Sequence, residues 1–255
     1  MAKIWKLVKI ALVLLLLVAA VLAGSQYYLP LVLERSLEES ILAAVDEAES
    51  VRVEIEAFPA LLLLTGRIPS LSLDVRQAVF NGLNVEAFLV DGENIVVDLP
   101  KLRQGEGLEI KKADSMRVSA VVAEADLNAY FAKESGDSGV NIQLGPETST
   151  VNGNLSVLGQ KIQLSVKGHF QVIAPASVAF VIDDILVAQA RLPRFITDPL
   201  AGKFAVTIDL ADSPIPLEIR DIRVADQRLY IYGQRPAHLV NSNNAKGRST
   251  REPAD

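Results

Sequence analysis

The chain has 255 residues, enough for one large β domain or two small ones, and all-β folds of this size often stay undivided, so we expect a single domain. Its 31 acidic and 25 basic residues give a net charge of −6, which argues against nucleic acid as a partner because phosphate binding depends on clustered positive charge. The absence of cysteine excludes disulfides, thiolate metal sites and a cysteine nucleophile.

The N-terminus carries a membrane-directed pattern. Basic residues precede an apolar run over residues 10–23, and aromatic residues flank that run: Lys3, Lys6 and Lys9, with Trp5, Tyr27 and Tyr28. Counted from Trp5 to Gly24, the segment approaches the roughly 20 residues that a membrane-spanning helix needs. Counted strictly, it has the length of a secretory signal, and residues 21–23 resemble a cleavage site.

Both interpretations, a signal peptide or a signal anchor over residues 1–28, place the lysines inside the cell and the rest of the chain outside. We therefore expect a protein of the cell envelope. It is either anchored at the extracytoplasmic face of the cytoplasmic membrane or secreted after cleavage. A lipoprotein anchor is excluded because no cysteine follows the apolar run.

An amphipathic helix is expected over residues 30–50, where apolar residues recur at steps of three and four and Pro30 suits the first turn. From residue 51 the period changes to strict alternation, which indicates a strand with one buried face. Further strands are expected at residues 71–76, 85–90, 95–99, 116–122, 154–158, 161–167, 170–173, 177–182, 204–210, 217–224 and 229–232.

The densest apolar run, residues 58–66, is apolar on both faces of any strand that it forms. This pattern favours a strand buried on both sides, and a segment in contact with lipid is the alternative. Asp91-Gly92 and Asn152-Gly153 are read as turns between short antiparallel strands.

A second helix is expected over residues 124–135, and a short turn over residues 193–202. The last residues are polar and charged, as in a disordered end. The expected division is therefore a membrane segment over residues 1–28, one β-rich domain over residues 29–235 and a polar tail over residues 236–255.

Catalytic chemistry is nearly absent from the sequence. Of the two histidines, His169 lies within an expected strand, and the neighbouring acids Asp183 and Asp184 would point to opposite faces of theirs. There is no serine elbow, phosphate-binding loop or metal-ligand spacing. We therefore expect no enzyme, no cofactor and no metal, the alternative being an enzyme of envelope glycolipids that uses these three residues.

The sequence offers instead a surplus of aliphatic strands beside an amphipathic helix, since 50% of the residues are hydrophobic and only 5% aromatic. A concave apolar groove for acyl chains needs this composition and no catalytic residue. The alternative is a scaffolding module that binds another envelope protein through a sheet edge or through the helix.

The order of these features resembles the LmeA-type phospholipid-binding proteins of bacterial envelopes. The likeness covers residues 31–233, and its carriers are residues 58–67 (FPALLLLTGR), 123–130 (AEADLNAY), 215–224 (IPLEIRDIRV) and 229–233 (LYIYG). The resemblance implies an α+β, mostly β fold with a long curved antiparallel sheet around an amphipathic helix, similar to tubular lipid-binding domains. It also implies a phospholipid ligand, held or transferred, and no enzymatic activity.

The family offers no ligand signature to carry over, so the candidate groove residues are large apolar side chains of the expected strands and helix. They are Leu61, Leu63, Phe80, Phe88, Phe131 and Phe180. Each of them also fits an ordinary core position. The expected partners are phospholipid and, through residues 1–28, the membrane, and no sequence pattern assigns an oligomeric state.

Overall fold

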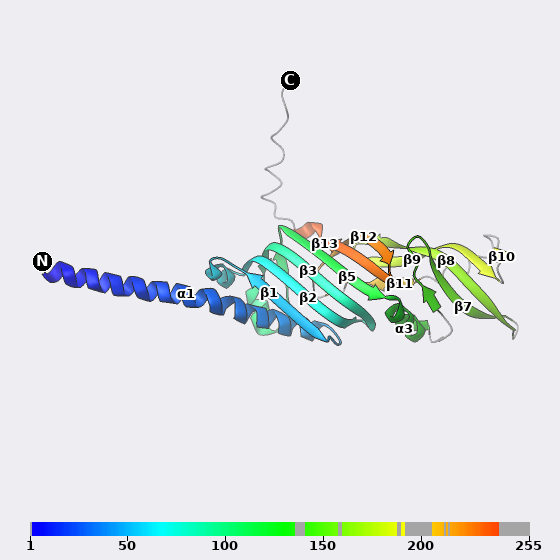
Figure 1. Cartoon of the computed structure of the whole chain (residues 1–255), viewed down its shortest axis with the longest axis horizontal. Coiled ribbons are helices and arrows are strands. Elements are labelled where there is room, and N and C mark those ends of the chain that lie inside the picture. Colours follow the sequence, from blue (N-terminus) through cyan, green and yellow to red (C-terminus); the bar gives the residue numbers. More distant parts are fainter. Residues whose placement is uncertain are drawn as a thin grey trace, which may run out of the picture.

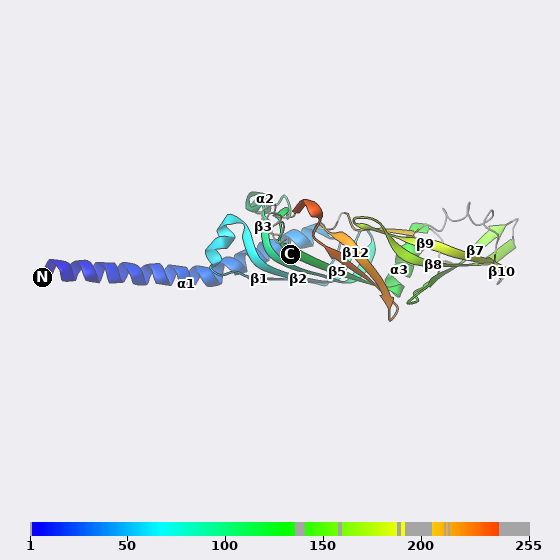
Figure 2. The ribbon, with the colours of Figure 1, turned by 90° about the horizontal axis from the view of Figure 1, so that it is seen from above.

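The computed structural model describes residues 2–135, 141–157, 160–187, 190–191, 206–211, 213 and 215–239. The molecule is elongated: a long helix leads from the N-terminus into a curled antiparallel sheet, and a second antiparallel sheet continues the long axis (Figures 1 and 2). The mostly β class with a curved sheet around a helix is confirmed. The turn expected at residues 193–202 and the chain from residue 240 lie outside the described residues.

Helix α1 is one element from Ala2 to Ala44. Residues 9–24 are exposed, whereas Leu33, Leu37 and Ile41 form a buried stripe. The spacing of four residues places these three side chains on one face of the helix. The membrane segment and the expected amphipathic helix are therefore continuous.

The expected helix boundaries are wrong at both ends. Pro30 lies inside α1 and not in a first turn. A proline within a helix removes one backbone hydrogen bond, and α1 continues on both sides of that position. The helix ends at Ala44 because the chain then turns into the sheet, where Glu47 pairs with Val79.

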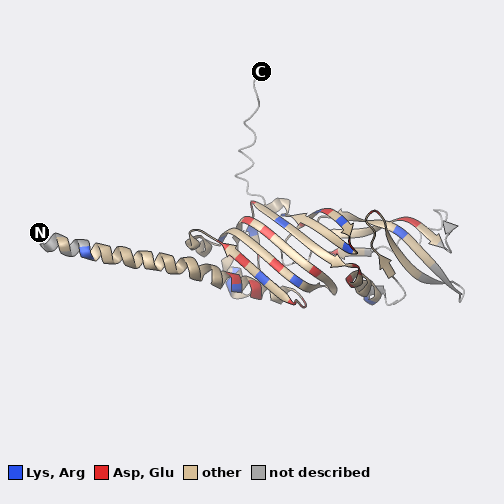
Figure 3. Ribbon diagram, viewed as in Figure 1, with Lys and Arg blue, Asp and Glu red and all other residues tan. Residues whose placement is uncertain are grey.

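Sheet A has the strand order β1-β2-β3-β5-β13-β12, and β4 pairs with β3. Its strands are β1 Ser50–Glu56, β2 Arg67–Phe80, β3 Leu83–Val97, β4 Ile110–Lys112, β5 Ser115–Ala123, β12 Glu218–Ala225 and β13 Arg228–Gln234. The register aligns apolar side chains in a row across the inner face, formed by Val51, Val75, Phe88, Ala120 and Ile231. The charged residues on these strands are exposed or half-buried, and Figure 3 marks their positions along the strands.

The connections of sheet A include the 3₁₀ helix η1 at Ala60–Thr65, helix α2 at Leu99–Gln104 and the 3₁₀ helix η2 at Ala237–Leu239. The buried strand expected at residues 58–66 is therefore wrong. Pro59 precedes η1, and Gly66 ends it in the left-handed region at φ 77. At Gly66 a side chain would also lie 2.5 Å from the Val97 carbonyl oxygen, so glycine is required.

The Asp91-Gly92 and Asn152-Gly153 pairs are not turns. Asp91-Gly92 lies within β3. A Cβ at Gly92 would lie 2.5 Å from Ile95 Cδ1, so the glycine leaves room for the Ile95 side chain. The hairpin turn between β2 and β3 is formed by Asn81-Gly82, both at positive φ. Asn152-Gly153 lies within β7, which runs from Ser149 to Val157.

Sheet B has the order β10-β9-β8-β7-β6, and β11 pairs with β9. Its other strands are β6 Asn141–Gln143, β8 Gln160–Ala174, β9 Ser177–Val187, β10 Ala190–Arg191 and β11 Val206–Asp209. The turn between β8 and β9 meets sheet A, where Ile219 N donates to the Pro175 carbonyl at 2.6 Å. Buried apolar side chains of both sheets belong to one continuous core.

Helix α3 runs from Glu124 to Ser135, as predicted. Its Asn128 amide donates to the Ile142 carbonyl and accepts from the Ile142 N–H, at 2.9 and 2.6 Å. Glu124 accepts from Leu144 N at 2.7 Å, and Asp126 accepts from the Asn84 side chain at 2.8 Å. The helix therefore joins the edge strand of sheet B to β3 of sheet A.

The edge of sheet A at β1 is covered in the same way by α1. Glu34 and Glu38, one helical turn apart, accept hydrogen bonds from the N–H groups of Ile55 and Val53 at 2.9 and 3.2 Å. Without them, these part-buried donors at a strand edge would be unpaired. The side chains of α1 thus replace a neighbouring strand.

The Glu34 contact gives a prediction for stability. We expect Glu34→Ala to lower the free energy of unfolding by about 1.5–3 kcal/mol, the contribution of a hydrogen bond to a charged group. Glu34→Gln keeps an oxygen acceptor and should lose less. Urea denaturation of the full chain in detergent measures the change, and Glu39→Ala, an exposed acid of the same helix, is the control. An equal loss in Glu34→Ala and Glu39→Ala would contradict this role.

Candidate functional site

The candidate site is the apolar interior between α1 and the inner face of sheet A. One wall is the helical stripe of Leu33, Leu37 and Ile41, and the other is the set of inward-facing strand residues. Among the described residues, Ser149 of sheet B is the one buried polar side chain. This interior therefore has the apolar lining that acyl chains require.

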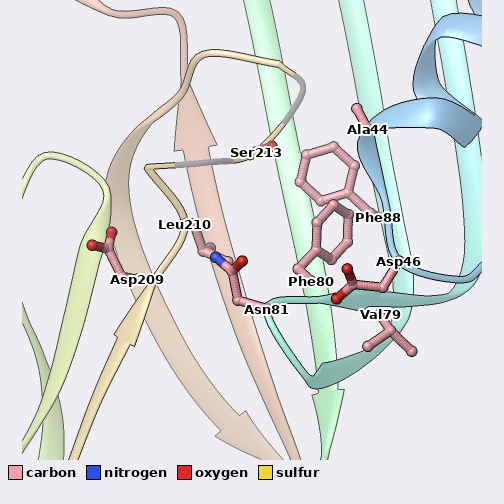
Figure 4. A pocket seen from close by; sticks show the side chains of 9 residues that line it. All are labelled: Ala44, Asp46, Val79, Phe80, Asn81, Phe88, Asp209, Leu210 and Ser213. Atoms are coloured by element: carbon pink, nitrogen blue, oxygen red, sulfur yellow. The ribbon is translucent and has the colours of Figure 1, made fainter.

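Two candidate residues, Phe80 and Phe88, come together at the end of this interior that lies beside the end of α1. Their ring centroids are 5.6 Å apart, and Phe88 is 1% exposed. Figure 4 shows both rings beside a cavity of about 40 Å³ that Ala44, Asp46, Asp209 and Leu210 also line. Because the two aspartates make this rim acidic, it disfavours an anionic headgroup.

Leu61 and Leu63 lie at the opposite end of the interior, in η1. Leu63 is buried, and it borders a small cleft of about 70 Å³ whose other lining residues include Leu29, Leu64 and Leu102. Leu61 is 40% exposed and lies outside this cleft. The cleft opens next to the point where α1 leaves the domain.

The other two candidates lie elsewhere. Phe131 is buried in α3, and its ring meets that of Tyr130 at a centroid distance of 5.2 Å. Phe180 is buried in sheet B beside Phe170, and its ring lies against Gly168, where a Cβ would lie 2.7 Å from Phe180 Cζ. The six candidates therefore lie at four places: the two ends of the interior, helix α3 and sheet B.

Sequence reasoning missed the part of the lining that α1 contributes. The stripe of Leu33, Leu37 and Ile41 was visible as a helical period, but periodicity does not show which surface it faces. The polar contacts of Glu34 and Glu38 with the β1 edge had no local signal, because their partners lie about 15–21 residues along the chain.

An open depression of about 650 Å³ lies beside η1, lined by residues that include Leu62, Arg67, Lys111, Lys112 and Asp114. Lys111 pairs with Asp98 at 2.6 Å, and its hydrogen bond is the main reason why the pKa of Asp98 is lowered. Arg67 and Lys112 have no carboxylate partner in the part of the chain that the structure describes. This end of the domain therefore offers free cations.

The residues considered for catalysis form a surface pair. His169 Nδ1 lies 3.0 Å from Asp183 Oδ2, and both side chains are about half exposed. The nearby Ser149 is buried and is paired in register with Gly168, so it faces the side of the sheet opposite to His169. Within the described ranges no group of three or more His, Asp or Glu is placed to hold a metal.

Comparison with known proteins gives one match. The family model described as LmeA-like phospholipid-binding matches residues 28–234 of the chain. No curated protein and no solved structure matches. The matched residues include the second half of α1, both sheets and the candidate interior. The chain therefore belongs to the LmeA-like phospholipid-binding family.

Proposed function

We propose that the protein is tethered to the cytoplasmic membrane by the first half of α1, with its domain on the extracytoplasmic side. In this proposal the domain holds the acyl chains of a phospholipid between the second half of α1 and the inner face of sheet A. One observation carries the proposal: the same continuous helix has an exposed apolar segment and then forms a wall of the apolar interior. Among the described residues, only this helix is long and apolar enough to cross a membrane.

The interior must widen to accept a lipid. Its two cavities measure about 40 and 70 Å³, well below the roughly 300 Å³ of a small-molecule site. On the β1 side, α1 is held by side-chain hydrogen bonds and by its apolar stripe and not by a continuous strand ladder, so separation of the helix from the sheet breaks no backbone ladder. Acyl chains would then replace the contacts between Leu33, Leu37 and the inner face.

A lipid in this position would be stabilised mainly by burial of its apolar surface, at about 25 cal/mol per Å². Its headgroup would lie toward the η1 end, where Arg67 and Lys112 are free, and not at the acidic rim near Asp46 and Asp209. Lipid held in this way, beside a membrane tether, suits a role in lipid transfer or envelope biogenesis.

Native mass spectrometry of the full chain, purified in mild detergent, tests lipid binding. We expect co-purified phospholipid in the wild type and less in Ala120→Phe, because Ala120 is an inner-face residue between Phe88 and Ile231. Val121→Phe adds a ring on the opposite face of the same strand and is the matched control. The proposal fails if the wild type carries no phospholipid and takes up no fluorescent phospholipid from vesicles.

The chain has no cysteine, so single cysteines report the topology. In intact bacterial cells we expect Ile173→Cys, whose native side chain is 55% exposed, to react with a membrane-impermeant maleimide. Ala2→Cys should react only after lysis, or be missing from the mature protein if the segment is cleaved. Labelling of Ile173→Cys only after lysis would place the domain in the cytoplasm and contradict the proposal.

The packed interior favours one second candidate, a scaffolding module without a lipid cavity. The small volumes between α1 and sheet A are what such a module would have. The β12 edge of sheet A, however, carries Arg220 and Arg223, and charged side chains on an edge strand disfavour pairing with another chain. The lipid measurement described above separates the two functions.

A further inference from the structure

The most exposed apolar side chains outside the N-terminal half of α1 include three in one short loop, residues 58–64. Phe58 is 86% exposed, Leu64 54% and Leu61 40%. Phe58 precedes the 3₁₀ helix η1, and Leu61 and Leu64 belong to it. Because this helix has three residues per turn, Leu61 and Leu64 lie on one face, so the three side chains form one apolar projection. A contiguous apolar patch of this kind marks a surface that contacts another apolar phase.

This 58–64 loop is fixed to α1 by the side chain of Gln26. The Gln26 amide donates to the Ala57 carbonyl at 2.5 Å, and its oxygen accepts from the Ala60 N–H at 2.9 Å. The beginning of the loop is therefore bound at two points, Ala57 and Ala60, to a single residue of α1. The exposed side chains lie at a fixed height along α1.

That height corresponds to the surface of the membrane. Residues 10–33 of α1 carry no charge, between Lys9 and Glu34. Since a helix rises about 1.5 Å per residue, the roughly 30 Å hydrocarbon core takes about 20 residues, which from Ile10 reaches Leu29. Gln26 and the exposed Tyr27 and Tyr28 then lie at the outer boundary, where aromatic residues are favoured.

Basic residues flank the loop on both sides. Arg67, Lys111 and Lys112 share a depression with Leu62 and one acidic residue, Asp114, so its lining has a net positive charge. Arg103 borders the cleft that Leu63 and Leu64 line. Arg67, Arg103 and Lys112 have no carboxylate partner in the described chain. An apolar centre with basic flanks suits the interface of an anionic lipid bilayer.

We infer that the 58–64 loop is a second membrane-contact element. It inserts Phe58, Leu61 and Leu64 into the outer interface of the bilayer that α1 spans. Arg67, Arg103 and Lys112 then contact the phosphate groups of the lipids. The contact of the loop with the bilayer places the cleft lined by Leu29 and Leu63 at the bilayer surface. Lipid then enters the interior through this cleft, and this step rests on the proposed function.

The depth of the loop is measured on the full chain in vesicles of phosphatidylcholine and phosphatidylglycerol. Leu61→Cys, labelled with an environment-sensitive fluorophore, should show a blue-shifted emission and strong quenching by spin-labelled lipids. Ile173→Cys, also at an exposed aliphatic position but on sheet B, is the control and should stay in water. Equal, weak quenching at both positions would overturn the inference.

A Phe58→Ser variant tests the entry of lipid. Because this side chain is 86% exposed and lines neither cavity of the interior, the variant should keep the wild-type denaturation midpoint and its co-purified phospholipid. Its uptake of a self-quenched fluorescent phospholipid from the same vesicles should be at least about tenfold slower, since burial of one such side chain is already worth that factor. Unchanged uptake would contradict entry at the loop, whereas a wild type without any lipid would contradict the proposed function instead.

Discussion

The structure depends on how the backbone hydrogen-bonding groups at the sheet edges are satisfied. A curled sheet that stays open has two edges with unpaired N–H and C=O groups, which invite association with other chains. At β1 the carboxylates of Glu34 and Glu38 bind two of these N–H groups, and at β6 Asn128 binds both backbone groups of Ile142. Helices thus close these edges without adding strands.

This solution closes the β1 side of the interior with a helix and not with a further strand. A strand added beside β1 would fix the sheet through a ladder of backbone hydrogen bonds, whereas α1 adds a few polar contacts and an apolar stripe. The packing of Leu33, Leu37 and Ile41 against the sheet is non-directional, so in the proposed function acyl chains would take its place without an orphaned polar group. A protein built to bind lipid needs such an exchangeable wall.

The sequence predicted most features that follow from local periodicity. Helix α3 was predicted with its observed bounds, and the alternating strands and the mostly β class were correct. Features that depend on distant residues were missed: Gly92 was read as a turn although it accommodates Ile95, and the 58–66 run was read as a strand although Pro59 and Gly66 bound a 3₁₀ helix. The groove candidates split for the same reason, because residue type alone does not separate Phe88 of sheet A from Phe180 of sheet B.

The continuity of α1 has a consequence for orientation. A helix without a break transmits rotation as well as position. If α1 spans a bilayer as proposed, the face of α1 that packs on the sheet would also set which side of the domain faces that bilayer. One residue more or fewer between the apolar segment and Leu33 would turn the domain by about 100° and move it by about 1.5 Å. In the proposed tethered state, the number of residues in this stretch would therefore determine the angle at which the cleft lined by Leu29 and Leu63 faces the membrane surface.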